Sequence, residues 1–261
     1  MVAAIQRSIA VIDLLVGKPN GLPLGAIAER LSIPKSAAHR TLGELIELGY
    51  VRQDGTQGNY ILGLRLVSQA LKHLARIPLA DLARPVLDRL AQLSGELVRI
   101  GIVDGDNLVW VAKSQGSRTG LRYDPHPGLE VHFASTATGI AWLSTMPEER
   151  AIELLKQQGF DGEKYGPGSP RDVEHVLPLV RRAREEGYCY SDNTYELGTA
   201  AVAVPIVTPG KPAAGCLSVA GPNARLDRQT AVALVPHMRA AASELAMIAE
   251  NGVRPLLEDA E

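Results

Sequence analysis

The chain has 261 residues, of which 46% are hydrophobic and 21% are charged, so it is long enough for two domains and apolar enough to bury a core in each. This composition excludes a disordered chain and a coiled coil. The formal net charge of −2 argues against a protein coated all over for nucleic acid. The charge is uneven, however, because residues 1–65 carry a net +2 and the remaining residues a net −4.

No stretch approaches the roughly 18 apolar residues that a membrane span needs, and the N-terminus lacks the pattern of a signal peptide. We therefore expect a cytoplasmic protein. Its two cysteines, Cys189 and Cys216, lie inside separate apolar runs and form neither a disulfide framework nor a zinc knuckle. We expect both to be reduced residues of the core.

The N-terminal part of the chain shows three short helices and a hairpin. Apolar residues recur at helical spacing within residues 5–16, 24–31 and 34–48, with glycine or proline at the breaks. Two strand-like runs, 50–53 and 59–62, then flank a Gly-rich turn. Three helices with a tight second-to-third turn and a following hairpin predict a helix-turn-helix with a wing.

The third predicted helix can be divided into a buried and an exposed face. At 100° per residue, a narrow sector around Leu42, about 60° to either side, collects the apolar side chains. This predicted buried stripe consists of Ala38, Leu42, Leu45 and Ile46. Ser36 and Arg40 lie about 120° and 160° from Leu42 and so face outward. We interpret this helix as the recognition helix that enters the major groove of DNA.

The residues predicted to contact DNA are Lys35, Ser36, His39 and Arg40 on this helix and Arg52 in the wing. A first turn of small residues lets the helix approach phosphates closely. Two simpler explanations stay open. Arg40 can be a solvated side chain paired with Glu44, and the polarity of Gln57 and Asn59 in the wing can serve the turn alone.

Residues 64–75 predict one amphipathic linker helix, interrupted at Ile77-Pro78. Its apolar stripe consists of Leu64, Val67, Leu71 and Leu74. We expect this stripe to pack against a second copy of the chain, because duplex DNA offers symmetric half-sites to a two-fold dimer. The alternative is that it packs on its own domain.

The pattern changes after residue 79 and predicts an α+β domain. Two alternating runs around Asp104-Gly105 indicate a hairpin. The other expected elements are helices over 81–94, 136–146, 147–158, 171–186 and 227–250 and strands near 119–123, 188–193, 200–208 and 214–220. The predicted division is a winged helix-turn-helix over 1–63, a linker helix over 64–78, an effector-binding domain over 79–251 and a tail over 252–261.

Catalytic motifs are missing from the sequence: it has no Gly-x-Ser-x-Gly, P-loop, dinucleotide-binding glycine pattern or His-Glu-x-x-His. We therefore expect no enzyme activity and no cofactor. We also expect no metal, because His126 and His132, six positions apart in a loop, are better explained as ordinary histidines than as metal ligands. A binding pocket is better motivated. Ser135 or Thr136 is placed to cap a helix of small residues, where free amides suit a carboxylate; a simple cap is the alternative.

Three stretches of the sequence resemble the IclR family of bacterial transcriptional regulators, in an order and spacing that cover nearly the whole chain. Residues 34–42 with 48–51 look like its recognition helix and wing entry, and residues 59–63 like its wing exit. The third comprises residues 189–193, 197–205 and 217–222, which look like its effector domain.

The resemblance implies a winged helix-turn-helix, a linker helix and a C-terminal α/β effector-binding domain of GAF-like fold. It also implies a homodimer, often a dimer of dimers, that binds double-stranded operator DNA and a small-molecule effector. The effector would be a small organic acid or aromatic metabolite, and the target a catabolic operon, repressed more often than activated. The family's pocket positions carry over to Tyr123, Ala137, Thr138, Ser191, Thr199 and Ala201.

Three of these positions depart from the family. Ser191 stands where an acidic residue is common, Ala201 where a cysteine is common, and Tyr123 where an aliphatic side chain is common. We expect a roomier pocket with an aromatic wall, which favours an aromatic or ring-containing acid over two-carbon acids. The alternative function is a metabolite-binding or enzymatic module whose helix-turn-helix makes protein contacts only.

Overall fold

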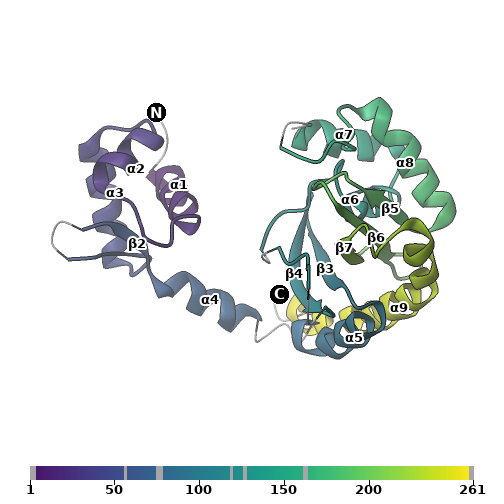
Figure 1. Cartoon of the computed structure of the whole chain (residues 1–261). Helices are drawn as coiled ribbons and strands as arrows, with labels where there is room; N and C mark the ends of the chain where they lie inside the picture. The colour runs from purple at the N-terminus through teal and green to yellow at the C-terminus, as the bar shows by residue number, and fades with distance from the viewer. Residues whose placement is uncertain are drawn as a thin grey trace. The chain divides into compact units, whose positions relative to one another are not determined.

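The computed structural model describes residues 4–55, 58–74, 79–117, 120–125, 128–160 and 164–258. The chain divides into two compact units, Met1–Arg76 and Ile77–Glu261 (Figure 1). Each unit has its own hydrophobic core.

The first unit is a winged helix-turn-helix followed by the linker helix. Its elements are α1 (Ala4–Val16), α2 (Leu24–Arg30), α3 (Lys35–Glu47), β1 (Val51–Gln53), β2 (Tyr60–Leu62) and α4 (Leu64–Leu74). The two strands pair antiparallel as the wing. Val11 and Leu15 of α1, Ile27 of α2 and Leu42 of α3 meet in its core.

Two left-handed residues set the length of α3. Ser32 has φ 53° in the turn between α2 and α3, where the amide of Ile33 donates to the carbonyl of Ala28 at 3.0 Å. Gly49 has φ 76° just after α3, and the amide of Tyr50 donates back to a carbonyl of the last turn. Glycine accepts this conformation without steric cost. The tight turn and the stop expected from the sequence are both present.

The predicted buried stripe of α3 wrongly includes one residue, Ile46. Ile46 is 38% exposed, whereas Thr41 is buried together with Ala38, Leu42 and Leu45. At 100° per residue these four are centred about 50° from Leu42 on the Thr41 side, which leaves Ile46 roughly 90° from the centre. The core of the unit lies on that side of the helix, so Ile46 remains at the edge.

The second unit is a five-stranded antiparallel sheet between two layers of helices. Its elements are α5 (Leu79–Ser94), β3 (Leu97–Asp104), β4 (Asn107–Gln115), α6 (Ala137–Leu143), α7 (Glu148–Gln158), α8 (Val173–Glu186), β5 (Cys189–Asp192), β6 (Thr199–Ile206), β7 (Gly215–Pro222) and α9 (Arg228–Glu258). The strand order is β4-β3-β7-β6-β5. Helices α5 and α9 cover one face, and α6 packs on the other with α8 against it (Figure 1).

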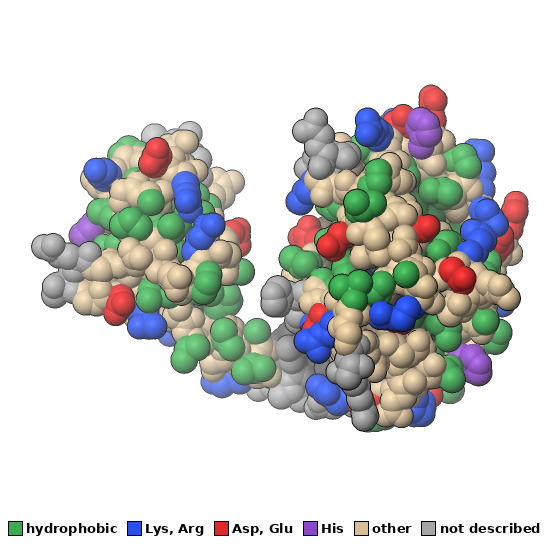
Figure 2. All heavy atoms as spheres, in the orientation of Figure 1, with side chains coloured by type: hydrophobic (Ala, Val, Ile, Leu, Met, Phe, Trp, Pro, Cys, Tyr) green, Lys and Arg blue, Asp and Glu red, His purple; other side chains and the backbone are tan. Residues whose placement is uncertain are grey.

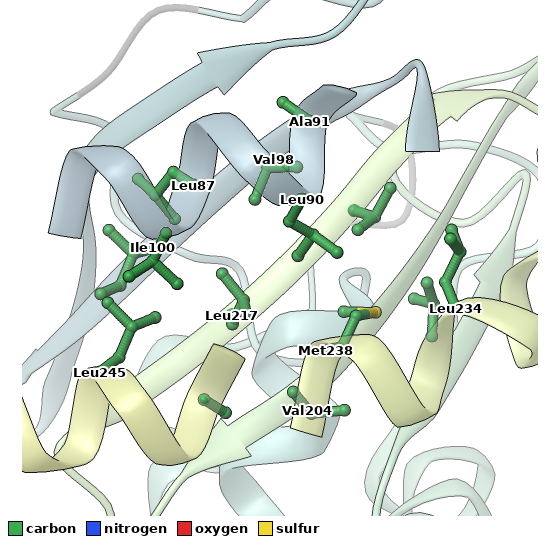
Figure 3. Packing of buried hydrophobic residues seen from close by; sticks show 14 of the residues in the cluster. Leu87, Leu90, Ala91, Val98, Ile100, Val204, Leu217, Leu234, Met238 and Leu245 are labelled. Carbon is green, nitrogen blue, oxygen red and sulfur yellow. The ribbon is translucent and has the colours of Figure 1, made fainter. Parts of the chain in front are cut away.

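The two faces of this sheet differ in side-chain size. Because successive residues of a strand point to opposite faces, Val98 and Ile100 of β3 and Leu217 of β7 pack against α5 and α9 (Figure 3). The face toward α6 carries mostly small residues in the alternate positions of the three central strands. They are Arg99 and Gly101 of β3, Ala201 and Ala203 of β6, and Ser218 and Ala220 of β7. The small side chains leave space between the sheet and α6.

Two predictions for the second unit are wrong: one expected strand is absent from the described residues, and the last helix is longer than expected. Residues 120–123, expected in a strand, form no strand. The carbonyl of Tyr123 accepts from the side chain of Gln115 at 3.0 Å, so this segment is held by side chains rather than by a backbone ladder. Helix α9 continues through residues 252–258, where the sequence predicts a tail. Extending a formed helix needs no new nucleus.

The apolar stripe of α4 is exposed within its own unit. Leu64, Val67 and Leu71 are 80%, 46% and 61% exposed, and hydrophobic side chains lie at the surface of this helix in Figure 2. The helix is tied to the wing through polar groups, with the hydroxyl of Tyr50 donating to Gln69 at 2.9 Å. Packing on its own domain therefore does not account for these three residues. None of the helices in the described ranges has the length and hydrophobicity that a membrane crossing requires.

We predict that Leu217→Ala destabilises the second unit by about 2–5 kcal/mol, because Leu217 is fully buried between the sheet and α9. Both tryptophans of the chain, Trp110 and Trp142, lie in this unit, so fluorescence during denaturant unfolding measures it alone. The control Leu197→Ala, at a residue 72% exposed, should stay within about 0.5 kcal/mol. Equal losses in the two variants would contradict the packing described.

Candidate DNA interface and ligand cavity

The predicted DNA-contacting residues are all exposed. They are Lys35, Ser36, His39 and Arg40 of α3 and Arg52 of β1. The four on α3 lie within one half of the helix, between about 20° and 160° from Leu42, with Ser36 and Arg40 opposite the side that packs on the core and Lys35 and His39 at its flank. No side chain caps α3, whose first turn follows Pro34. The exposed half therefore presents two cations, a hydroxyl and an imidazole to solvent.

The structure bears on the two simpler explanations for the polar residues of α3 and the wing. Arg40 does pair with Glu44, at 3.5 Å between Nε and Oε1. Both side chains are exposed, and such pairs contribute only about 0–1 kcal/mol, so Arg40 is free to exchange this partner for a phosphate or base. Asn59 donates to the carbonyl of Asn20 at 3.0 Å and so anchors the wing. Gln57 lies outside the described residues.

All six positions that the resemblance assigns to the effector pocket line one cavity of the second unit. They are Tyr123, Ala137, Thr138, Ser191, Thr199 and Ala201. Six further residues complete the lining: Arg99, Thr136, Thr194, Tyr195, Ala200 and Ala220. The cavity lies between the small-residue face of the sheet and the first turn of α6. In register, Ser191 pairs with Ala201 and Ala201 with Ala220, so three small side chains form a row across β5, β6 and β7.

Thr136, rather than Ser135, caps α6. The Thr136 hydroxyl accepts from the amide of Gly139 at 2.9 Å and donates to the carbonyl of His132 at 2.8 Å. The Ser135 hydroxyl is fully buried, 2.7 Å from Nδ1 of His132 and 2.6 Å from the hydroxyl of Ser169. A serine beside a histidine suggests a nucleophile, but burial keeps any substrate from this hydroxyl. The pair therefore has a structural role.

The turn between β5 and β6 forms part of the cavity wall. The side-chain oxygen of Asn193 accepts from the amide of Gly198 at 2.7 Å. The hydroxyl of Thr194 donates to the carbonyl of Ser135 at 2.7 Å, which ties the turn to the segment before α6. Tyr195 follows directly and lies against Tyr165, at 5.3 Å between ring centroids. Hydrogen bonds thus fix the turn that carries an aromatic side chain into the lining.

Arg99 is the charged residue among the six lining residues that the sequence-based positions do not include. Its guanidinium lies 3.8 Å from the centroid of the Trp110 ring and 5.7 Å from that of Tyr123. Burial lowers the pKa of Arg99 and raises that of Tyr123 to about 12, so the phenol is neutral near pH 7. The signal was present in the sequence: Arg99 is the one charge inside the apolar run 97–103.

The expectation of a roomy pocket is wrong for this conformation. The free volume is about 20 Å³, which holds about one water molecule. The small residues of the sheet leave a hollow, but its lining also includes the large side chains of Arg99, Tyr123 and Tyr195, which come from three segments and occupy volume there. The departure at Tyr123 therefore fills space as well as supplying an aromatic wall.

Other reactive side chains show no assembled centre. His126 lies outside the described residues. His132 is buried with its ring stacked on Tyr165 at 4.1 Å. Over the described ranges, no three His, Cys, Asp or Glu side chains are grouped to hold a metal ion. Cys189 and Cys216 are free and buried, as predicted.

A winged helix-turn-helix with an exposed third helix, a helical linker and a second domain with a lined cavity define a DNA-binding regulator with a ligand-binding domain. Residues 4–55 match the model of the IclR helix-turn-helix domain, and residues 71–247 match that of the bacterial transcriptional regulator IclR C-terminal domain. The chain belongs to the IclR family, DNA-binding transcriptional regulators with a ligand-binding C-terminal domain.

Known relatives extend over almost the whole chain. The transcriptional regulator KipR of Bacillus subtilis is 27% identical over 241 residues, which is 92% of this chain and 94% of KipR. An IclR transcriptional regulator from Alicyclobacillus acidocaldarius superposes with a TM-score of 0.80 at 22% identity, covering 95% of this chain and 99% of that one. An IclR homologue from Microbacterium hydrocarbonoxydans, complexed with 4-hydroxybenzoate, gives 0.75 at 21% identity, covering 95% and 100%.

We predict that neither cysteine of the native protein reacts with Ellman's reagent at pH 8. Burial raises the pKa of Cys189 to about 12 and also raises that of Cys216. The reactive species is the thiolate, and a raised pKa keeps the thiol protonated until the pH approaches it. The absorbance assay should count no thiols in buffer and two in denaturant. A stoichiometric reaction in buffer would show that a cysteine is accessible.

Proposed function

We propose that this protein is a repressor of a catabolic operon that responds to a small organic acid with an aromatic or other ring. The observation that supports this most is the assembly of the six expected pocket positions around one cavity, with a buried cation in its lining. A carboxylate is the complementary ligand group for an arginine. Action on a bacterial operon places the protein in the cytoplasm.

The DNA contacts are proposed for Lys35, Ser36, His39, Arg40 and Arg52. The residues of α3 would meet base edges and phosphates in the major groove, and Arg52 of the wing would meet the backbone. A net charge of +2 over residues 1–65 is small for this task. Affinity must therefore come from a few well-placed cations used twice, which requires at least a dimer.

The exposed apolar residues of the first unit support a homo-oligomer. Leu64, Val67 and Leu71 of α4 and Ile5 and Ile9 of α1 are all exposed large side chains. A second copy, related by a two-fold axis, would bury them and set the spacing of two recognition helices to match two half-sites. We propose a dimer, with a dimer of dimers as the larger assembly.

The linker helix α4 is proposed to couple the two sites. Effector binding would favour one arrangement of the units over another and so change the distance between recognition helices, a population shift of about 1–3 kcal/mol. Residues 120–125, which carry Tyr123, lie outside the sheet ladder and offer the segment that could move to admit a ring. The 4-hydroxybenzoate complex of a relative supports an aromatic acid as the ligand class.

We predict that Arg40→Ala removes binding to the DNA upstream of the protein's own gene, because one base or phosphate contact per half-site is worth about 1–3 kcal/mol. The matched control is Glu44→Ala, which breaks the same ion pair but keeps the cation. It should bind DNA as tightly as the wild type or more tightly. Gel shifts at several stated salt concentrations measure both variants, since affinity falls with salt.

Equal loss in Arg40→Ala and Glu44→Ala would show that the ion pair, not a DNA contact, is what matters. Parallel loss of effector binding in Arg40→Ala would indicate misfolding. If the wild type itself shows no preference for this DNA over unrelated sequence, the alternative function is favoured, in which the helix-turn-helix makes protein contacts only.

We predict that aromatic carboxylates bind more tightly than two- or three-carbon acids. Tyr123 and Tyr195 line the cavity, and an aromatic side chain there would pack favourably against a planar ligand. Calorimetric titration of the full-length protein with benzoate, 4-hydroxybenzoate, glyoxylate and pyruvate measures the ranking. Binding of only the two short acids would contradict a ring-containing effector.

A further inference from the structure

We propose that Arg99 is the anchor for the carboxylate of the effector, and that its isolation makes the cavity selective for monocarboxylates. This inference rests on the proposed function and goes beyond it by naming the residue that recognises the ligand's charge. The family-based positions do not include Arg99; it emerges from the burial and contacts of its side chain.

The guanidinium of Arg99 is a buried charge without a charged partner. The residue is only 8% exposed, and no carboxylate in the described ranges forms an ion pair with it. Buried ions of this kind are normally paired, because an unpaired buried charge strongly destabilises the folded state. Glu96, the buried carboxylate at the start of the same region, is already bound by Arg225 at 2.6 Å. An anion from outside the chain would supply the missing partner.

Hydrogen bonding around Arg99 is incomplete as well. Its Nε is buried and finds no hydrogen-bond partner in the part of the chain that the structure describes, and the same is true of the hydroxyl of Ser218. The two residues are directly paired across β3 and β7, so their side chains leave the same face of the sheet. They do not satisfy each other. Arg99 lines the cavity, so its unsatisfied Nε indicates a place that a ligand completes, since such groups are otherwise rare.

The aromatic neighbours hold the guanidinium, Trp110 by stacking on one face and Tyr123 by a side-chain hydrogen bond, and leave Nε without a partner among the described residues. Trp110 covers one face at 3.8 Å from the ring centroid, an arrangement in which arginine stacks on the indole plane. Stacking uses the face of the guanidinium, whereas its N–H groups lie in the plane and can bind a carboxylate in a two-point arrangement. The neutral phenol of Tyr123 interacts with the guanidinium without neutralising it.

The rest of the lining argues against a second carboxylate. Apart from Arg99, the lining side chains are alanines and hydroxyl-bearing residues, and all are uncharged near pH 7. The exposed carboxylate of Glu196, which follows Tyr195, acts electrostatically on Tyr123 and would repel a second negative charge. One positive group with neutral surroundings therefore matches one carboxylate joined to a neutral remainder.

The test compares acids with their neutral amides in the full-length protein. Wild type, Arg99→Gln and Arg99→Lys are titrated with 4-hydroxybenzoate, 4-hydroxybenzamide and terephthalate, by calorimetry and by tryptophan fluorescence, to which Trp110 beside Arg99 contributes. The wild type should prefer the acid to the amide by roughly 30-fold or more, the expected effect of losing one partner of a buried charged hydrogen bond. Terephthalate, with two carboxylates, should bind more weakly than 4-hydroxybenzoate.

Arg99→Gln should abolish the preference for the acid, and Arg99→Lys should restore only part of it, because lysine lacks the planar two-point fork. The matched control is Arg122→Gln. Arg122 is an exposed cation one residue from Tyr123 and is already paired with Asp124 at 3.3 Å. This variant should bind 4-hydroxybenzoate like the wild type. An equal loss in Arg122→Gln would assign the effect to general positive charge and overturn the role of Arg99.

A second measurement separates ligand binding from folding. If Arg99 is kept for a ligand, replacing the unpaired buried charge should leave the melting temperature of the ligand-free protein unchanged or raised. A clear fall in Arg99→Gln would give Arg99 a structural role and overturn the proposal.

The outcomes also separate this inference from the proposed function. Equal binding of 4-hydroxybenzoate to wild type and Arg99→Gln overturns the anchor while the regulator with an acid effector stands. Equal binding of terephthalate and 4-hydroxybenzoate overturns the monocarboxylate selectivity. If neither 4-hydroxybenzoate nor benzoate, glyoxylate or pyruvate binds the wild type, the acid effector and the anchor both fail.

Discussion

The unequal faces of the five-stranded sheet are the constraint on which the second unit depends. Large aliphatic side chains such as Ile100 and Leu217 pack one face against α5 and α9 and form a continuous hydrophobic core there. That leaves the alternate positions of the same strands free to be small, and residues such as Ala201 and Ala220 leave room beneath α6. A rigid scaffold and a cavity thus come from one set of strands, by the alternation of side chains.

Arg99 lowers the stability of the folded protein and is proposed to serve ligand binding. A buried guanidinium that no carboxylate of the described residues pairs with opposes folding, and the stacking on Trp110 offsets only part of that cost. The hydrophobic layer on the opposite face tolerates such a residue because it does not depend on the cavity for its packing. The small free volume of the cavity is consistent with this role of Arg99, because Tyr123 and Tyr195 in the lining leave little room for water beside the charge.

The first unit has few charges with which to bind DNA. Its core is small, its recognition helix carries two cations, and its apolar residues on α1 and α4 are left exposed. Each of these features lowers the stability or the DNA affinity of a single copy. A second copy of the chain would bury the apolar surface and double the contacts with DNA. The modest charge that argues against nucleic acid over the whole chain becomes a reason for oligomerisation.

The sequence by itself determined the order of elements, the winged helix-turn-helix, the exposed face of α3 and, through the family resemblance, six cavity positions. These follow from periodicity, turn residues such as Gly49 and Gly105, and motif spacing, all of which are local. Only the tertiary structure decided that Ile46 lies at the edge of its core, that residues 120–123 leave the sheet and that Tyr123 fills the cavity. It alone revealed Arg99 as an unpaired buried charge, because the lack of a partner depends on every segment packed around it.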